Sequence, residues 1–327
     1  MMSAMTNHAL QASVIICAYT QERWENLKAA VTSIQYQETP AGEIILVIDH
    51  NAELLEMART QFPSITVLEN HGPRGLSGAR NTGVEFADKE VVAFMDEDAV
   101  AQPDWLTRLL MGYYDGHVIG VGGLVEPNWL GKRPAWFPDE FTWVVGCSYK
   151  GVPETKEHVR NMLGCNMSFR REVFATAGGF LNSLGRVGSK LPLSCEETEF
   201  CIRVSRRFPQ SRFWYIPQAR VRHSVPPSRM TWQYYRARCF AEGLSKAMVA
   251  NFVGTGQGLA TERKYTTRTL PVGILRGIGD AFLKGDLAGL LRASAIAVGL
   301  GITAVGYLAG FISSHLRPAR TSLLKPI

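Results

Sequence analysis

The sequence predicts an α/β fold in which helices cover both faces of a largely parallel sheet. Four apolar segments rich in valine and isoleucine recur in the first hundred residues, and helix-like segments separate them. Each apolar segment is nearly continuous rather than alternating with polar residues. That pattern is typical of strands buried on both faces of a parallel sheet.

The individual elements follow from the same signals. Strands are expected where β-branched apolar residues cluster, at 13–18, 43–49, 65–69, 91–96 and 163–170. Helices are expected at 24–35, 52–61, 77–87, 171–177, 195–207 and 230–249. The tryptophan- and proline-rich segment 126–160 is interpreted as an ordered excursion, and the glycine-rich segment 178–192 as a loop.

The composition describes a globular chain of 327 residues, with 46% hydrophobic and 20% charged residues. The net charge of +6 favours contact with phosphates or an anionic membrane surface. The basic residues are scattered rather than grouped with aromatics, so a nucleic-acid protein is not predicted. Six cysteines without a CxxC pair or zinc-ligand spacing indicate a reducing compartment. The first residues show no signal-peptide pattern.

Polar residues gather where the predicted strands end. Asp49 and Asp96 close the second and fourth strands, and Thr20 follows the first. Ligands of such sheets bind outside the carboxyl ends of the strands. A binding site is therefore expected at this edge of the sheet.

The fourth strand ends in AFMDEDAV, where three adjacent carboxylates repel one another. Asp96 and Asp98 suit a hard cation such as Mg²⁺ or Mn²⁺, which binds carboxylates together with substrate phosphates. The alternative is a solvated acidic turn that caps the next helix, near residue 103. Bound metal would neutralise the repulsion between the carboxylates. The motifs described below favour the metal site over the acidic turn.

The C-terminal part is more apolar than the rest. Residues 293–314 carry no charge over 22 residues, and a membrane-spanning helix needs about 20 predominantly apolar residues. Gly306 and Gly310 form a GxxxG pattern that brings membrane helices close together. We predict a linker and interfacial helix over 251–292 and a transmembrane helix with a short tail over 293–327. The alternative is a buried hairpin that completes the core, and the flanking basic residues are too evenly placed to set an orientation.

Six segments occur in the order of a known family. They are SVIICAYTQER, EIILVIDHN, GLSGARNTGVEFA, MDEDA, GCNMSFRREVFATAGGF and CEETEFCIRV. Over residues 12–245 the chain resembles the family 2 glycosyltransferases of the GT-A fold, a Rossmann-like mixed sheet covered by helices. Each segment is weak alone, but the ordered set is specific. The resemblance implies a catalytic domain over 1–250.

That resemblance implies transfer of a sugar from a nucleotide diphosphate sugar, with inversion at the anomeric carbon. A metal, Mn²⁺ or Mg²⁺, would neutralise the leaving diphosphate. Asp98 corresponds to the principal metal ligand, and Asp96 to a ligand of the metal or of the donor's ribose and sugar. His223 corresponds to a histidine that completes the metal or diphosphate site, although an isolated histidine is more often a structural hydrogen bonder.

The remaining donor-binding residues implied by the resemblance lie at the first strand end, at the second strand end and on the helix after the third strand. They are Ala18, Tyr19, Thr20, Glu22, Asp49 and Arg80. A structural salt bridge is the alternative role for Arg80.

An inverting displacement needs a base that takes the proton of the acceptor hydroxyl. The family has an aspartate there, in a Glu-Asp pair, and here the pair is Glu196 and Glu197. Glu197 therefore occupies the base position with one additional methylene, which leaves Glu196 and Glu199 open as alternatives. Acids at this place would also be explained by the dipole of the helix that they begin.

The chain resembles members that act on polyprenyl-linked glycans or cell-surface polysaccharides. We therefore predict a glycosyltransferase at the cell membrane, with its catalytic domain facing the cytoplasm, that adds one sugar from a donor of the common UDP type. A nucleotidyltransferase is disfavoured because the loop AYTQERWEN has no glycine. A scaffold without catalysis is supported only by Glu197. The sugar, the acceptor and the oligomeric state are not encoded in these motifs.

Overall fold

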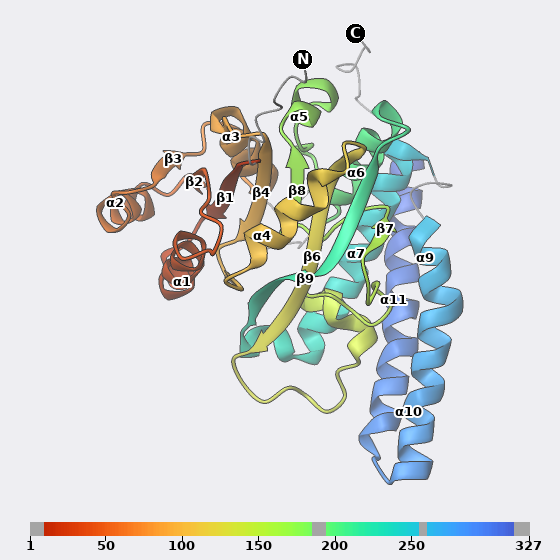
Figure 1. Ribbon diagram of the computed structural model, residues 1–327. Coiled ribbons are helices and arrows are strands. Elements are labelled where there is room, and N and C mark those ends of the chain that lie inside the picture. The colour runs from red at the N-terminus through yellow and green to blue at the C-terminus, as the bar shows by residue number, and fades with distance from the viewer. Residues whose placement is uncertain (1–9, 185–193, 255–259, 317–327) are drawn as a thin grey trace, which may run out of the picture.

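The predicted parallel strands form the N-terminal half of a mixed, nine-stranded sheet (Figure 1). The computed structural model describes residues 10–184, 194–254 and 260–316. The strands are β1 (Ala12–Ala18), β2 (Glu43–Ile48), β3 (Thr66–Glu69), β4 (Val91–Asp96), β5 (Ala99–Ala101), β6 (Val118–Trp129), β7 (Glu157–Val159), β8 (Asn166–Arg170) and β9 (Arg212–Val225). Their order is β3-β2-β1-β4-β8-β6-β9-β5, with β7 paired to β9.

The sheet changes character after β4. β1 pairs in parallel with β2 and β4, and β2 with β3, as the sequence predicts. Beyond β4, β8 lies antiparallel to β4 and β6, β6 runs parallel to β9, and β5 and β7 are antiparallel to β9. Because β1, β2 and β4 are adjacent and parallel, the residues that follow them share one edge of the sheet.

Helices cover both faces of the sheet. They are α1 (Trp24–Gln35), α2 (Ala52–Gln61), α3 (Leu76–Phe86), α4 (Trp105–Met111), α5 (Glu172–Ala177), α6 (Glu196–Arg207) and α7 (Trp232–Val253), with 3₁₀ turns η1 (Gln21–Arg23), η2 (Gly112–Tyr114), η3 (Asp139–Val145) and η4 (Pro227–Met230). Alternate side chains of β1 point to opposite layers. Val14 and Ile16 pack with α1, α2 and α4, whereas Ile15 packs with α3, α5 and α6.

The predicted helices and the first four strands are confirmed to within a few residues. α7 is longer than expected and continues to Val253. Residues 185–192 of the predicted glycine-rich loop lie outside the described residues.

Sequence patterns missed the strands β5, β6, β7 and β9. Glycines normally weaken a strand, and β6 contains three of them, at 120, 122 and 123. Here they permit close approach, because a Cβ on Gly123 would overlap the carbonyl of Ala219 and one on Gly120 would lie 2.6 Å from the ring of Phe213. The register between β6 and β9 shifts next to Gly123. The glycines therefore fit β6 against β9.

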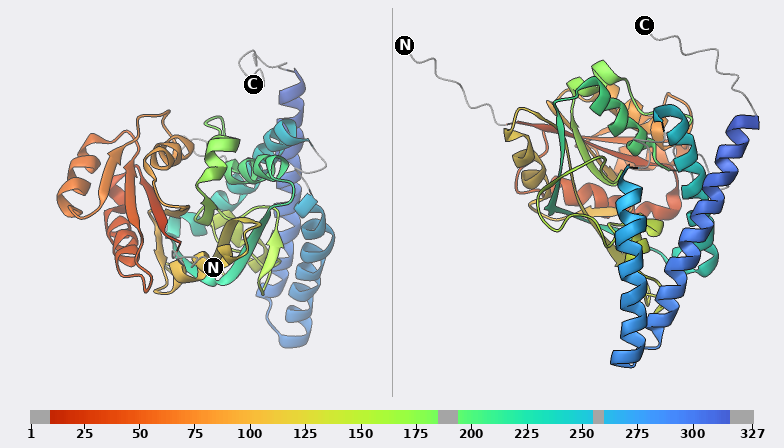
Figure 2. Two further views of the ribbon diagram at one scale, coloured as in Figure 1. Left: turned by 45° about the horizontal axis from the view of Figure 1, so that its top comes forward. Right: turned by 90° about the vertical axis from the view of Figure 1, so that its right-hand side faces the viewer.

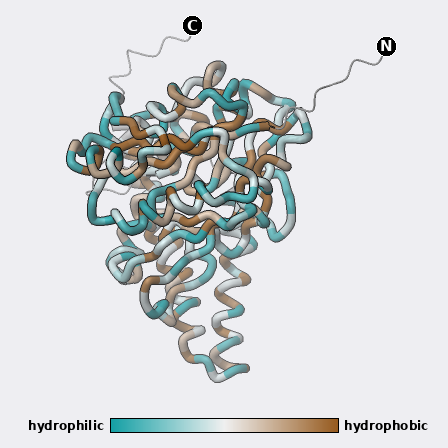
Figure 3. The backbone as a smooth tube through the Cα atoms, turned by 60° about the vertical axis from the view of Figure 1, so that its left-hand side comes forward, coloured by the Kyte–Doolittle hydropathy of each residue, from teal (hydrophilic) through white to brown (hydrophobic). Residues whose placement is uncertain are grey.

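The C-terminal part forms a long helical hairpin that projects from the body of the domain (Figures 2 and 3). Its first arm runs through α9 (Ala260–Lys264), a π-helical segment η5 (Tyr265–Thr269) and α10 (Leu270–Lys284). Its second arm is α11 (Ala288–Leu316), which begins before the predicted boundary at 293. Among the described helices, Ala288–Ser313 is long and apolar enough to cross a membrane by length and composition.

The GxxxG of α11 packs within the chain, against α7. A Cβ on Gly306 would overlap the carbonyl of Phe240, and one on Gly310 would lie 2.8 Å from the Cβ of Ala247. In return, a Cβ on Gly243 of α7 would overlap the carbonyl of Thr303. Small residues on both helices thus let the two backbones touch, which is the close approach that the pattern predicted between membrane helices.

We expect Gly243→Ala to lower the free energy of unfolding by about 1–3 kcal/mol, because the added methyl overlaps the backbone of α11. Gly301→Ala on α11 is the matched control, since nothing lies within 4 Å of a Cβ there. That control should stabilise the helix by about 0.5–1 kcal/mol. Urea unfolding of both variants measures the difference, and equal stabilities would contradict the close packing of α7 on α11.

Candidate active site

Each acid of the AFMDEDAV segment faces a protein cation. Asp96 lies 3.3 Å from Arg80, and Glu97 lies 2.8 Å from Arg23. Asp98 lies 3.1 Å from His223 and 3.3 Å from the same Arg23. The mutual repulsion that the sequence raises as a problem is therefore offset by side chains from other elements.

Asp98 is the most strongly held of the three acids. It lies in the turn between β4 and β5, and β5 pairs with β9 so that Ala99 is opposite His223. Its carboxylate is buried and contacts His223, Arg23 and, at 3.4 Å, Arg229. Burial by itself would raise the pKa of Asp98, but the charges of His223 and Arg229 lower it well below the usual value. The carboxylate therefore stays ionised.

Arg80 joins the strand-end acids to the acids of α6. It is buried, and its Nη1 donates to Glu196 Oε1 at 2.8 Å while its Nη2 donates to Asp96 Oδ1 at 3.3 Å. The rings of Phe94 and Phe180 lie 5.9 and 5.6 Å from the guanidinium carbon. In this arrangement Arg80 positions two carboxylates that are 100 residues apart in the sequence.

Three donor atoms of different chemistry meet beside Arg80. The ligand atoms of Asp96, Cys165 and His223 lie within 4.8 Å of one another. Oxygen, sulfur and nitrogen donors at this spacing fit a divalent cation. Among the described residues, this group does not include Asp98, the principal metal ligand that the resemblance implied; its oxygens face His223, Arg23 and Arg229.

Cys165 is the residue that sequence reasoning missed. It is buried, as a free thiol that acts as a small hydrophobic side chain normally is. The antiparallel pairing of β8 with β4 sets Asn166 opposite Met95, and so brings the preceding Cys165 to the end of β4. The signal in the sequence was its place inside GCNMSFRREVFATAGGF, one of the six segments that carry the family resemblance.

The predicted donor-binding residues at the first two strand ends also lie at this edge. Tyr19 is half exposed, Glu22 is exposed, and the hydroxyl of Thr20 accepts a hydrogen bond from the backbone of Glu22 at 3.3 Å. Ala18 is buried at the end of β1, and its carbonyl accepts from the Asp49 backbone at 2.7 Å. The loop from 18 to 22 is therefore ordered against the end of β2.

The carboxylate of Asp49 is engaged by the protein. Its two oxygens accept from the Gly75 backbone at 2.9 Å and from the Asn70 amide at 2.6 Å, and His50 lies 2.9 Å away. These contacts tie the end of β2 to the loop before α3. The same oxygens are the ones that a nucleoside contact would use.

The two carboxylates expected to carry the base have different surroundings. Glu196 is buried and paired with Arg80. Among the described residues no ion pair involves Glu197, which accepts a hydrogen bond from Thr198 at 3.4 Å. Burial and the charge of Glu196 raise the pKa of Glu197 to about 8. Glu199, the third alternative, is paired with Arg203 at 2.8 Å.

The family of the chain follows from its similarity to known proteins. The model of Glycosyl transferase family 2 matches residues 13–178. A glucosyl-dolichyl phosphate glucuronosyltransferase of Haloferax volcanii is 32% identical over 94% of this chain and 98% of its own length. The chain belongs to glycosyltransferase family 2. It is therefore an enzyme, as predicted.

Other relatives and solved structures agree with this placement. The succinoglycan biosynthesis protein ExoM of Rhizobium meliloti is 26% identical over 73% of this chain and 75% of its own length. The mannosyltransferase PcManGT of Pyrobaculum calidifontis, solved with GDP-Man and Mn²⁺, has a TM-score of 0.57 at 16% identity, covering 92% of this chain and 88% of that one. GalNAc-T7, solved with UDP, GalNAc and Mn²⁺, has a TM-score of 0.51 at 18% identity, over 80% and 55%. The predicted GT-A fold is confirmed.

We expect Arg80→Met to destabilise this glycosyltransferase by about 3–5 kcal/mol, because it leaves two carboxylates without their buried partner. The double variant Arg80→Met, Glu196→Gln should recover part of that loss by removing the deeper of the two charges. Urea unfolding of the single and double variants gives the comparison. A single variant as stable as the wild type would show that Arg80 does not hold the site together.

Proposed function

We propose that this enzyme transfers one sugar from a nucleotide diphosphate sugar to a lipid-linked glycan acceptor, with inversion at the anomeric carbon. The observation that carries the proposal is the position of Arg80 between Asp96 and Glu196. It sets the acids that would face the donor beside the acid pair that would face the acceptor. The catalytic domain would span 1–250 and the membrane-attachment segment 251–327.

The donor would bind at the shared strand edge, with its diphosphate toward the end of β4. Asp96 and His223 would hold the metal there, with Cys165 beside them and Asp98 orienting His223. Bound metal would neutralise the charge of the leaving diphosphate. A donor set with an imidazole favours Mn²⁺ over Mg²⁺, which prefers oxygen and water. UDP is the proposed nucleotide, with Asp49 and the loop 18–22 on its nucleoside side.

Glu197 would accept the proton of the attacking hydroxyl. Its neighbour Glu196 is paired with Arg80, so Glu197 is the carboxylate of the two that has no ion-pair partner among the described residues. A base with a pKa of about 8 takes up a proton more readily than an ordinary glutamate at the same pH. Glu196 would act as a positioning residue that raises this pKa.

The lipid-linked acceptor is supported by the Haloferax volcanii relative, whose name gives glucosyl-dolichyl phosphate as its acceptor. The apolar α11 supports attachment of the enzyme to the same membrane. The catalytic domain would face the cytoplasm, where nucleotide sugars are made.

Metal-dependent donor binding tests the first half of the proposal. We expect UDP to bind more tightly with Mn²⁺ than with Mg²⁺. His223→Ala and Asp98→Ala should abolish the dependence on metal, because the first removes a proposed metal ligand and the second removes the carboxylate that orients it. Calorimetry with UDP, GDP and dTDP measures this, with His71→Ala as the control because His71 pairs with Glu85 on the surface. Metal-independent binding in the wild type would refute the proposed donor site.

The pH dependence of transfer tests the base. A base must be deprotonated to act, so kcat should rise with pH up to about 8 and level off above it. Glu197→Gln should keep UDP binding and lose transfer by about 10²–10⁴-fold. Glu196→Gln should retain transfer and move the rise to lower pH, because it removes the charge that raises the pKa of Glu197. Wild-type transfer by Glu197→Gln would assign the base elsewhere, and donor binding without transfer in the wild type would identify a scaffold.

A further inference from the structure

We propose that the α10–α11 hairpin binds the membrane lying along its surface, and that α11 stays packed on the catalytic domain instead of crossing the bilayer. This inference rests on the membrane attachment proposed above and gives it a mode. It also replaces the transmembrane helix that the sequence predicts over 293–327. The surface concerned is the outward face of the hairpin, defined below by its residues.

The inward face of α11 is occupied by the catalytic domain along most of its apolar length. Tyr235 of α7 donates to the carbonyl of Ala295 at 2.9 Å, and a Cβ on Gly299 would lie 2.6 Å from the ring of Phe141 in η3. Further along, Gly306 and Gly310 touch the backbone and side chains of α7. Contacts from 295 to 310 run along one face of the segment that would have to enter the hydrocarbon, while only 22% of its apolar window is buried and the other face stays exposed.

The helix that α11 packs on cannot follow it into a bilayer. α7 carries Lys246, which lies 3.1 Å from Glu242 and 2.6 Å from Glu262, and Arg160 lies 2.9 Å from the same Glu262. Moving such charges into hydrocarbon is costly. A spanning α11 would therefore have to leave α7 and expose the glycine contacts that join them.

The outward face of the hairpin is apolar and exposed. At its tip, Phe282 and Leu283 are 77% and 87% exposed. Along the two arms the exposed large hydrophobic residues are Val272, Leu275, Ile278, Leu287, Leu290, Leu291, Val298, Val305, Leu308, Phe311 and Ile312. Both arms lie on the same side of the molecule (Figure 2). A helical surface of this kind binds at the boundary between headgroups and acyl chains.

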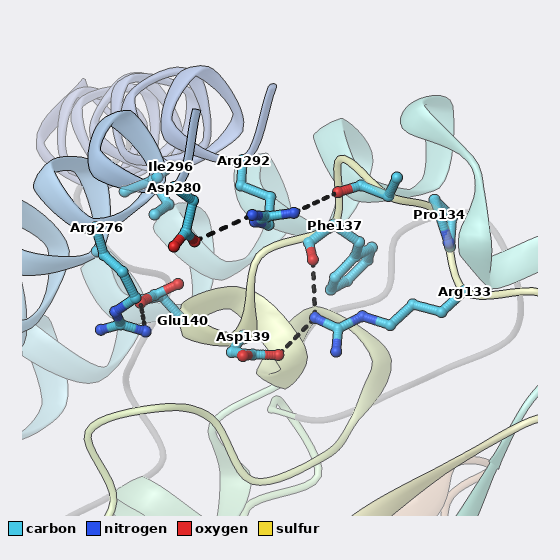
Figure 4. Close-up of a pocket in the computed structure, with 12 residues that line it drawn as sticks. Arg133, Pro134, Phe137, Asp139, Glu140, Arg276, Asp280, Arg292 and Ile296 are labelled. Atoms are coloured by element: carbon cyan, nitrogen blue, oxygen red, sulfur yellow. Dashed lines mark hydrogen bonds and ion pairs between the residues drawn. The ribbon is translucent and has the colours of Figure 1, made fainter. Parts of the chain in front are cut away.

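The charged side chains of α10, α11 and the turn between them pair within the protein, and Figure 4 shows Arg276 beside Glu140 and Asp280 beside Arg292. Between residues 270 and 313 the charged side chains are Arg276, Asp280, Lys284, Asp286 and Arg292. Arg276 pairs with Glu140, Asp280 with Lys284 and Arg292, and Asp286 with Arg292. Of these residues, Arg276, Asp280 and Arg292 line a cavity of about 350 Å³ between the hairpin and the segment 133–140. The apolar side chains, rather than a net charge, would therefore carry binding.

This arrangement would keep the active site close to the lipid. α11 packs on Phe141 of η3, and Gly146, just after η3, adopts a left-handed conformation (φ 86°) against the ring of His223. A Cβ on Gly146 would lie 3.2 Å from that ring. Only η3 and Gly146 thus lie between the hairpin and the proposed metal-binding residue His223. A lipid-linked acceptor in the membrane would therefore be within reach of the active site.

Topology decides between the two modes. The full chain with a C-terminal epitope tag would be expressed in bacteria, and sealed inverted membrane vesicles would be treated with protease. We expect the tag and the catalytic domain to be digested together without detergent, since both lie on one side. In intact spheroplasts both should be protected. A tag on the opposite side from the catalytic domain would overturn the proposal in favour of a spanning helix.

Vesicle flotation tests the surface itself. The purified chain should bind preformed phosphatidylcholine vesicles, and the triple variant Val298→Glu, Val305→Glu, Leu308→Glu should bind at least about tenfold more weakly. Phe86→Glu and Tyr36→Glu are matched controls, because both residues are exposed and outside the hairpin, and they should bind as the wild type does. Equal binding by the triple variant, or binding only when anionic phosphatidylglycerol is added, would contradict an apolar contact.

Failure of this inference is distinguishable from failure of the proposed function. UDP binding and thermal unfolding of the triple variant should match the wild type, since its residues lie outside the donor site and are exposed. An enzyme that binds vesicles through the hairpin but transfers no sugar would refute the function and leave the membrane mode standing. An enzyme that transfers sugar but does not float with the vesicles would refute the membrane mode and leave the proposed function standing.

Discussion

The candidate active site depends on the two ion pairs that the buried guanidinium of Arg80 forms with Asp96 and Glu196. Arg80 reaches from α3 to carboxylates on β4 and α6, and two aromatic rings border it. A buried charge without a partner is costly, so the arginine and the two acids hold one another in place. This single residue connects the strand edge where the donor would bind to the helix that would carry the base. It also leaves Glu197 as the member of its pair without an ion-pair partner in the described chain.

Charge compensation explains why three acids can follow a buried strand. Arg23, Arg80 and Arg229 supply positive charge beside the three acids, and His223 lies 3.1 Å from Asp98. The alternative interpretation of the acidic segment, a solvated turn that caps the next helix, is wrong, because Glu97 and Asp98 are buried and face Arg23 and His223.

The C-terminal hairpin combines two alternatives that seemed exclusive in the sequence. One face of α11 completes the core against α7 and η3, as a buried hairpin would. Its other face presents exposed apolar side chains, as a membrane-binding helix would. Glycines contribute to this arrangement, because Gly243, Gly306 and Gly310 bring α7 and α11 into backbone contact, while Ile296 is a large side chain of α11 buried in the core.

The sequence by itself determined the local elements and the family. Continuous β-branched runs and helical periodicity are properties of neighbouring residues, so β1 to β4 and their helices were predictable. The ordered motifs identified the family and named Asp96, Asp98, Glu196, Glu197 and His223. Only the tertiary structure decided which cation meets which acid, since Arg80 and Glu196, or Arg229 and Asp98, lie more than a hundred residues apart. It also brought Cys165 to the end of β4 and turned the GxxxG inward, because pairing between distant strands and helices leaves no mark in a local pattern.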